Sequence, residues 1–169
     1  MNSKKHPFIF IFNILIFSFI ILLYYTDSAG IKISTASALL ILPLLTAFSL
    51  FHSPLASGLT GVIVGIFMDA CAPSSYCFNA TVLMLIAVFV AVASNTLFNK
   101  NIPSAAVLSL ITSVFYFVYQ WIVFHAAVES LNNSLIYLLN YALPSAVFSA
   151  IFIFPFYFLY KKFHKISLE

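Results

Sequence analysis

The chain has 169 residues, of which 63% are hydrophobic and only 7% are charged, and its mean hydropathy is +1.11. So few charges exclude a soluble globular domain, which needs many more charged groups facing water. The chain also leaves no room for a soluble catalytic domain, so we expect one all-α integral membrane domain over residues 1–169. The net charge of +3 comes from lysines at the ends of apolar runs, a pattern that sets membrane orientation and does not indicate nucleic-acid binding.

Six apolar runs predict six transmembrane helices, in chain order residues 7–25, 34–51, 55–70, 79–98, 103–127 and 135–160. The first run is longer than the hydrophobic part of an ordinary signal peptide, and further spans follow it, so we interpret it as a retained span. The second and third runs are short and are separated only by His52, Ser53 and Pro54. This favours a tight helical hairpin or a partly re-entrant pair, because Pro54 can begin a helix but would break one already running.

The lysines predict how these spans are oriented. An even number of spans places both termini on the same side of the membrane, and with the termini in the cytoplasm only Lys32 of the seven lysines lies outside. Asp27, Asp69 and Glu129 then face the outer side. The pattern therefore predicts a six-helix bundle with both termini cytoplasmic.

The third run contains the sharpest pattern, because Ser57, Gly61, Gly65 and Asp69 recur every four residues. In a helix these positions form one narrow stripe, and small residues there let a second helix approach closely. We interpret the stripe as a packed seam that ends in an anchoring carboxylate for a loop or a partner. The alternative is that Asp69 is a loop acid that merely ends the span.

The fourth run offers a complementary surface. Asn79 stands at its start and is suited to cap the helix, since its side-chain oxygen can accept a hydrogen bond from a free backbone N–H. Ala87 and Ala91 form a small face on the same helix, and we expect it to pack against Gly61 and Gly65. The loop between the two runs holds both cysteines, Cys71 and Cys77, which we expect to remain free thiols.

This region resembles the MreD family of bacterial rod shape-determining proteins. That family shows a Gly-xxx-Gly-xxx-Asp stretch, a short glycine-bearing loop, and a Gly-x-Asn-Ala start to the next span. The positions of this chain that match the pattern are Gly61, Gly65, Asp69, Asn79 and Ala80. Cys77 departs from it, because it stands where glycine is usual.

The resemblance implies a non-enzymatic scaffold in the bacterial cytoplasmic membrane, with an S-component-like fold and without a cofactor. The partners it implies are an MreC-like membrane-anchored protein, MreB-linked machinery and peptidoglycan synthases of the cell-elongation system. Whether the protein forms a homodimer stays open.

The polar residues of the fifth run allow a second interpretation. Ser109, Ser113, Tyr116 and Gln120 recur at helical spacing, and we expect them to form hydrogen bonds between helices. The alternative is a ligand pocket to which Gln120, Trp121 and Asn79 contribute, as in a vitamin-binding S-component of an energy-coupling-factor transporter. An enzyme fits poorly, because Asp69 and Glu129 lie in different loops without an evident catalytic partner.

Overall fold

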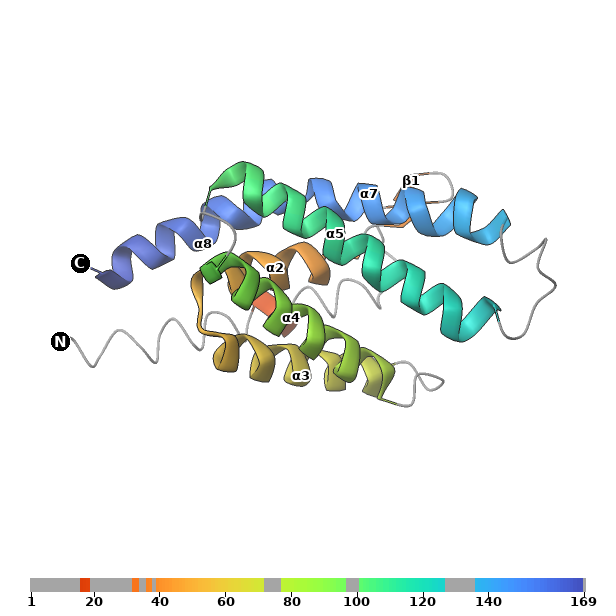
Figure 1. Ribbon diagram of the computed structural model, residues 1–169, viewed down its shortest axis with the longest axis horizontal. Coiled ribbons are helices and arrows are strands. Elements are labelled where there is room, and N and C mark those ends of the chain that lie inside the picture. Colours follow the sequence, from red (N-terminus) through yellow and green to blue (C-terminus); the bar gives the residue numbers. More distant parts are fainter. Residues whose placement is uncertain are drawn as a thin grey trace.

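The computed structural model describes residues 16–18, 32–33, 36–37, 39–71, 77–96, 101–126 and 136–168. These residues form a helical bundle with one small pair of antiparallel strands, in which Lys32 lies opposite Ser37 (Figure 1). The elements are, in chain order, β1 (Lys32–Ile33), β2 (Ala36–Ser37), α2 (Ile41–Phe51), α3 (Pro54–Cys71), α4 (Phe78–Thr96), α5 (Ile102–Trp121), the π-helices η1 (Ile122–Ala126) and η2 (Leu138–Ala142), α7 (Leu143–Ile151) and α8 (Ile153–Leu168).

Four helical segments are long and apolar enough to cross a membrane, namely Pro54–Cys71, Phe78–Thr96, Ile102–Phe124 and Leu138–Lys162. They correspond to the last four predicted runs and run alternately in opposite directions through the bundle (Figure 1). Their outward faces carry large apolar side chains such as Leu55 and Leu139, whose exposed fractions are 75% and 61%. Side chains of this kind remain exposed where lipid surrounds the protein, so the described bundle has the surface of a membrane protein.

The second predicted run forms a shorter helix than expected. We predicted a span over residues 34–51, whereas α2 covers only Ile41–Phe51 and β2 precedes it. Eleven residues extend about 16 Å, too little for the helix to cross a bilayer by itself. The physical reason is the position of α2 inside the protein: every residue from Ile41 to Leu50 is buried, and α4, α5 and α8 pack around it. A helix that is apolar on all sides can be a central core element as well as a span.

The beginning of α2 is tied to α7. The backbone N–H of Leu39 donates to the Ser149 hydroxyl over 2.9 Å, and that hydroxyl donates in turn to the Ser145 carbonyl oxygen over 2.7 Å. The other end of α2 meets a ring cluster in which His52 stacks on Phe48 with ring centroids 3.9 Å apart. Tyr160 of α8 and Phe17 of the first predicted run both meet Phe48 edge-on. The first run lies otherwise outside the described residues.

The α3 and α4 helices form the most closely packed pair in the described bundle. A Cβ atom added to Gly61 would lie 2.6 Å from the Leu83 carbonyl oxygen, and one added to Gly65 would collide with the backbone of Ala80. The two backbones therefore touch along the glycine stripe, as small residues at a helix interface permit. The backbone atoms nearest the stripe belong to the first two turns of α4, whereas the fully buried Ala87 and Ala91 lie further along that helix.

The α4 helix starts from an unusual backbone conformation at Cys77. Its φ of 58° lies in the left-handed region, where glycine is favoured because a Cβ atom costs energy there. This is the position at which the sequence pattern departs from glycine. The chain thus keeps a glycine-like turn with a cysteine in it.

Prolines mark the irregular points of the last helical segment. Pro144 follows the π-helix η2, after which the Leu143 N–H donates to the Leu138 carbonyl oxygen five residues back. Between α7 and α8 the Phe152 N–H reaches Ser149, three residues back, and Pro155 follows in the first turn of α8. A proline cannot donate into the helical ladder, so each break falls where the sequence makes regular hydrogen bonding impossible.

We predict that Gly65→Ala destabilises the protein by roughly 3 kcal/mol, because the new methyl group has to separate two backbones that touch. Gly58→Ala is the matched control, since the new Cβ atom would meet only the side-chain Cγ2 of Val88, at 2.9 Å. Thermal unfolding of both variants in mild detergent measures the difference. Equal unfolding temperatures for Gly65→Ala and Gly58→Ala would contradict the contact.

We also predict that Cys77→Gly stabilises the protein by about 1 kcal/mol, because glycine relieves the left-handed strain. Cys71→Gly is the control at the other cysteine, which ends a helix. There glycine should be neutral or destabilising, as its greater freedom in the unfolded chain is not offset. Thermal unfolding again gives the measurement, and a lower unfolding temperature for Cys77→Gly than for the native protein would refute this prediction.

Candidate functional site

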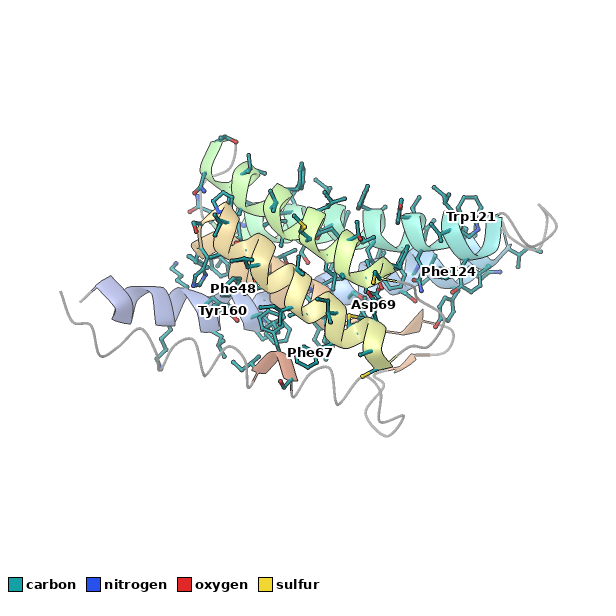
Figure 2. The ribbon with its side chains drawn as sticks, turned by 90° about the horizontal axis from the view of Figure 1, so that it is seen from below. Phe48, Phe67, Asp69, Trp121, Phe124 and Tyr160 are labelled. Carbon is teal, nitrogen blue, oxygen red and sulfur yellow. The ribbon has the colours of Figure 1, made fainter. Side chains whose placement is uncertain are left out.

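The side chain of Asp69 lies at the C-terminal end of the glycine stripe, half-buried in the last turn of α3 (Figure 2). Its Oδ1 accepts hydrogen bonds from the backbone N–H of Asn79 over 3.1 Å and from the Asn79 amide Nδ2 over 2.9 Å. Its Oδ2 accepts a third, from the backbone N–H of Ala80, over 3.0 Å. One carboxylate of α3 therefore binds the first turn of α4 at three points.

This arrangement follows from the chemistry of a helix start. The first N–H groups of a helix have no partner inside the helix, and the helix dipole favours a negative charge beside them. We predicted that Asn79 would cap α4 with its own side chain, and this prediction was wrong. Asn79 lies inside the first turn, and Asp69 accepts the N–H groups instead, because the close approach at Gly65 brings a stronger acceptor within reach.

The Asn79 amide connects this contact to a third helix. Its Oδ1 accepts a 2.6 Å hydrogen bond from the hydroxyl of Tyr116 on α5, and both side chains are buried. We call Asp69, Asn79 and Tyr116 the Asp69 network. The polar stripe of the fifth run included Tyr116, but its partner could not be foreseen, since 37 residues separate the two.

Aromatic rings cover the network on the side of α5. The ring of Phe78 stacks on Tyr119 with centroids 5.5 Å apart, and it meets Tyr116 and Phe124 edge-on at 6.2 and 5.1 Å. This packing shields the Tyr116–Asn79 hydrogen bond from water on that side. A hydrogen bond in such surroundings is electrostatically stronger than one in water.

The other predicted site residues occupy two different places. Ser57, Ala87 and Ala91 are fully buried, and belong to the small-residue faces of α3 and α4. Gln120 is half-buried on α5, about one turn beyond Tyr116, with Trp121 next to it at the end of the helix (Figure 2). The structure thus brings Asp69 and Asn79 together, and it places Gln120 outside the network.

The serines of α5 do not form the hydrogen bonds between helices that we expected. Within the part of the chain that the structure describes, the buried hydroxyls of Ser109 and Ser113 have no hydrogen-bond partner. Tyr116 is the member of the stripe whose bond to another helix is established. The physical reason is reach: a serine hydroxyl is short, and these serines pack as small residues.

The two cysteines near Asp69 do not belong to the Asp69 network. Cys71 and Cys77 are free thiols and both are exposed. Cys71 follows Asp69 by two residues, about 200° around the helix, and so it points away from α4. Among the described residues no group of three or more His, Cys, Asp and Glu side chains is placed to hold a metal ion.

The hydrogen bonds of this site fix the positions of helices relative to one another. Each hydrogen bond described for the Asp69 carboxylate joins it to α4, and the Asn79 amide passes the connection on to α5. The network therefore holds the end of α3, the start of α4 and the part of α5 around Tyr116 in fixed positions relative to one another.

Comparison with known proteins agrees with the motif. A sequence model described as rod shape-determining protein MreD matches residues 4–166, which is nearly the whole chain. Searches of the curated proteins and of the solved structures gave no significant match. The stretch that carries the resemblance, from Gly61 to Ala80, also forms the closest helix contact and supplies Asp69 and Asn79 to the Asp69 network. The chain therefore belongs to the rod shape-determining MreD family.

Proposed function

We propose that this protein is a non-enzymatic scaffold of the bacterial cell-elongation machinery in the cytoplasmic membrane. The observation that carries the proposal is that the motif residues Gly65, Asp69 and Asn79 build a rigid helix junction, in a chain of the rod-shape family. In this role the protein contributes to rod shape and peptidoglycan synthesis by holding other proteins in place. The vitamin-binding alternative is not favoured, because the family match indicates a rod-shape protein.

The partners follow from the family. We propose that the bundle binds an MreC-like membrane-anchored protein and, with it, peptidoglycan synthases and MreB-linked machinery. The network supports this role mechanically: a partner that binds the outer end meets three helices fixed to one another by hydrogen bonds. The junction needs no chemistry beyond charge and hydrogen bonding.

The proposed bundle has six helices in one domain, an S-component-like arrangement, and both termini in the cytoplasm. In this arrangement the short α2 and the strand segment before it together make the second crossing. Lys161 and Lys162 are exposed at the end of the last candidate span, where cytoplasmic lysines are expected. Asp69 lies at the end of α3 that is away from α8, the helix that carries this lysine pair, in agreement with an outer position (Figures 1 and 2).

Cysteine labelling tests the orientation. In a protein that carries Cys71→Ala and Cys77→Gly, a cysteine introduced at Ser3 or at Ser167 should react with a membrane-impermeant maleimide only after the cells are permeabilised. The native protein is the control, since exposed Cys71 and Cys77 should react in intact cells. Labelling of either introduced cysteine in intact cells would rule out this orientation.

Substitution of Asp69 tests the scaffold. In a strain depleted of the native copy, Asp69→Asn should retain rod shape better than Asp69→Leu, because asparagine keeps one acceptor oxygen for Asn79. The Asp69→Asn variant should still be about 2 kcal/mol less stable than the native protein, since the NH₂ group of the new side chain faces the N–H of Ala80. Tyr116→Phe, which removes one hydrogen bond to Asn79, should cost about 1 kcal/mol and leave most cells rod-shaped.

Glu129→Leu is the control, because it removes another acid that is predicted on the outer side between two spans. Cell width and length are measured by microscopy, and membrane levels of each variant by immunoblot. Normal rods with both Asp69 variants would show that rod shape does not depend on Asp69. Normal rods in the complete absence of the gene would remove the case for the scaffold.

A further inference from the structure

The two halves of the bundle differ in length. The candidate spans of α3 and α4 contain 18 and 19 residues, whereas those of α5–η1 and η2–α7–α8 contain 23 and 25. At about 1.5 Å per residue these are roughly 28 Å and 36 Å. Figure 1 shows where the excess lies: α3, α4 and α5 are level at the end near α8, and the α5–α7 hairpin projects beyond α3 and α4 at the other end.

The Asp69 network gives the register between the halves. Because Tyr116 donates to Asn79, this residue of α5 is level with the first turn of α4. The candidate span of α5 continues from Tyr116 to Phe124, about 12 Å further along the helix. Trp121 and Phe124 accordingly lie beyond Asp69 along the bundle (Figure 2).

The exposed apolar surface follows the same asymmetry. On α3 the large exposed apolar side chains run from Leu55 to Phe67, about 18 Å, and on α4 they run from Met84 to Val92, about 12 Å. Within the described residues they run from Val107 to Val123 on α5 and η1, about 24 Å, and from Ile136 to Phe158 on the last helical segment, about 33 Å. Only this last band matches a hydrocarbon core about 30 Å thick.

We propose that the protein thins the bilayer along the α3–α4 hairpin, in the leaflet at the Asp69 end, so that lipid headgroups and water descend to Asp69. A flat bilayer that covered the C-terminal band would place the half-buried carboxylate of Asp69 and the exposed hydroxyl of Thr81 in hydrocarbon. A charge inside the hydrocarbon costs several kcal/mol, whereas thinning costs only a fraction of a kcal/mol per Å. The surface thus fits a locally lowered phospholipid headgroup layer, a property separate from the scaffold role.

The two native cysteines make this measurable, since both are exposed at the end of the α3–α4 hairpin. A spin label on Cys77, in a Cys71→Ala protein, reports the thinned side. A spin label on Leu139→Cys, in a protein that also carries Cys71→Ala and Cys77→Gly, reports the projecting hairpin. If the Leu139→Cys protein unfolds at a lower temperature than the native protein, the label is placed on Ile136→Cys instead. Both proteins are reconstituted in phosphatidylcholine–phosphatidylglycerol vesicles, and collision with oxygen and with a water-soluble nickel chelate is measured by power-saturation electron paramagnetic resonance.

The two labels should differ in their ratio of oxygen to nickel collisions, and thinning predicts which label has the lower ratio. The ratio of oxygen to nickel collisions should be several-fold lower at Cys77 than at Leu139→Cys, so the residue nearer the middle of the bundle is the wetter one. A flat bilayer gives the opposite order, because Leu139 lies further out along the bundle. A higher ratio at Cys77 than at Leu139→Cys, or equal ratios at both positions, would overturn the proposal.

Discussion

The contact between the backbones of α3 and α4 at Gly65 is the constraint on which the Asp69 end of the bundle depends. The backbone atoms of Ala80 lie where a side chain at position 65 would begin, so the helices can be this close only with glycine there. One turn further on, the same closeness brings the Asp69 carboxylate within hydrogen-bond distance of two N–H groups that begin α4. Packing and electrostatics therefore depend on each other: a wider spacing would leave both the carboxylate and the helix start without partners.

Hydrogen bonding and close packing are the interactions a membrane bundle has to rely on. Lipid is as apolar as the helices, so burying apolar side chains does little to hold helices together. In this protein the central helix α2 is apolar throughout, and its described side-chain anchor is the hydroxyl of Ser149 on α7. The Asp69 network supplies a second polar connection, between α3, α4 and α5. These contacts explain how so apolar a chain adopts one arrangement of helices.

A junction of this kind holds three helices in fixed positions, as the proposed scaffold role requires. The carboxylate is only half-buried, so its charge keeps some contact with solvent while it orders α4. Rings of Phe78, Tyr119 and Phe124 protect the buried part of the network. The apolar faces of α3 and of the last helical segment stay exposed to the surroundings in bands of different height. The hydrogen-bonded Asp69 network and the apolar bands of different height together give the protein a defined shape at its Asp69 end.

Several features could be predicted from the sequence because they depend on local composition. The last four candidate spans follow from unbroken apolar runs bounded by charges and turn residues. The small-residue stripe that ends in Asp69 follows from helical periodicity. The family resemblance, which rests on the same short stretch, is confirmed by the match over residues 4–166. The irregular points at Pro144 and Pro155 follow from the missing N–H of proline.

Only the tertiary structure shows the contacts between residues that are far apart in the chain. An apolar run fits a span and a central core helix equally well, so only the packing of α4, α5 and α8 shows that α2 is the latter. Asn79 had the chemistry of a helix cap, but Asp69 is the acceptor because the backbones touch at Gly65. Composition and periodicity along one chain determine which segments are helical and apolar. Which polar atoms meet depends on distances between helices, and those are set only when the helices pack.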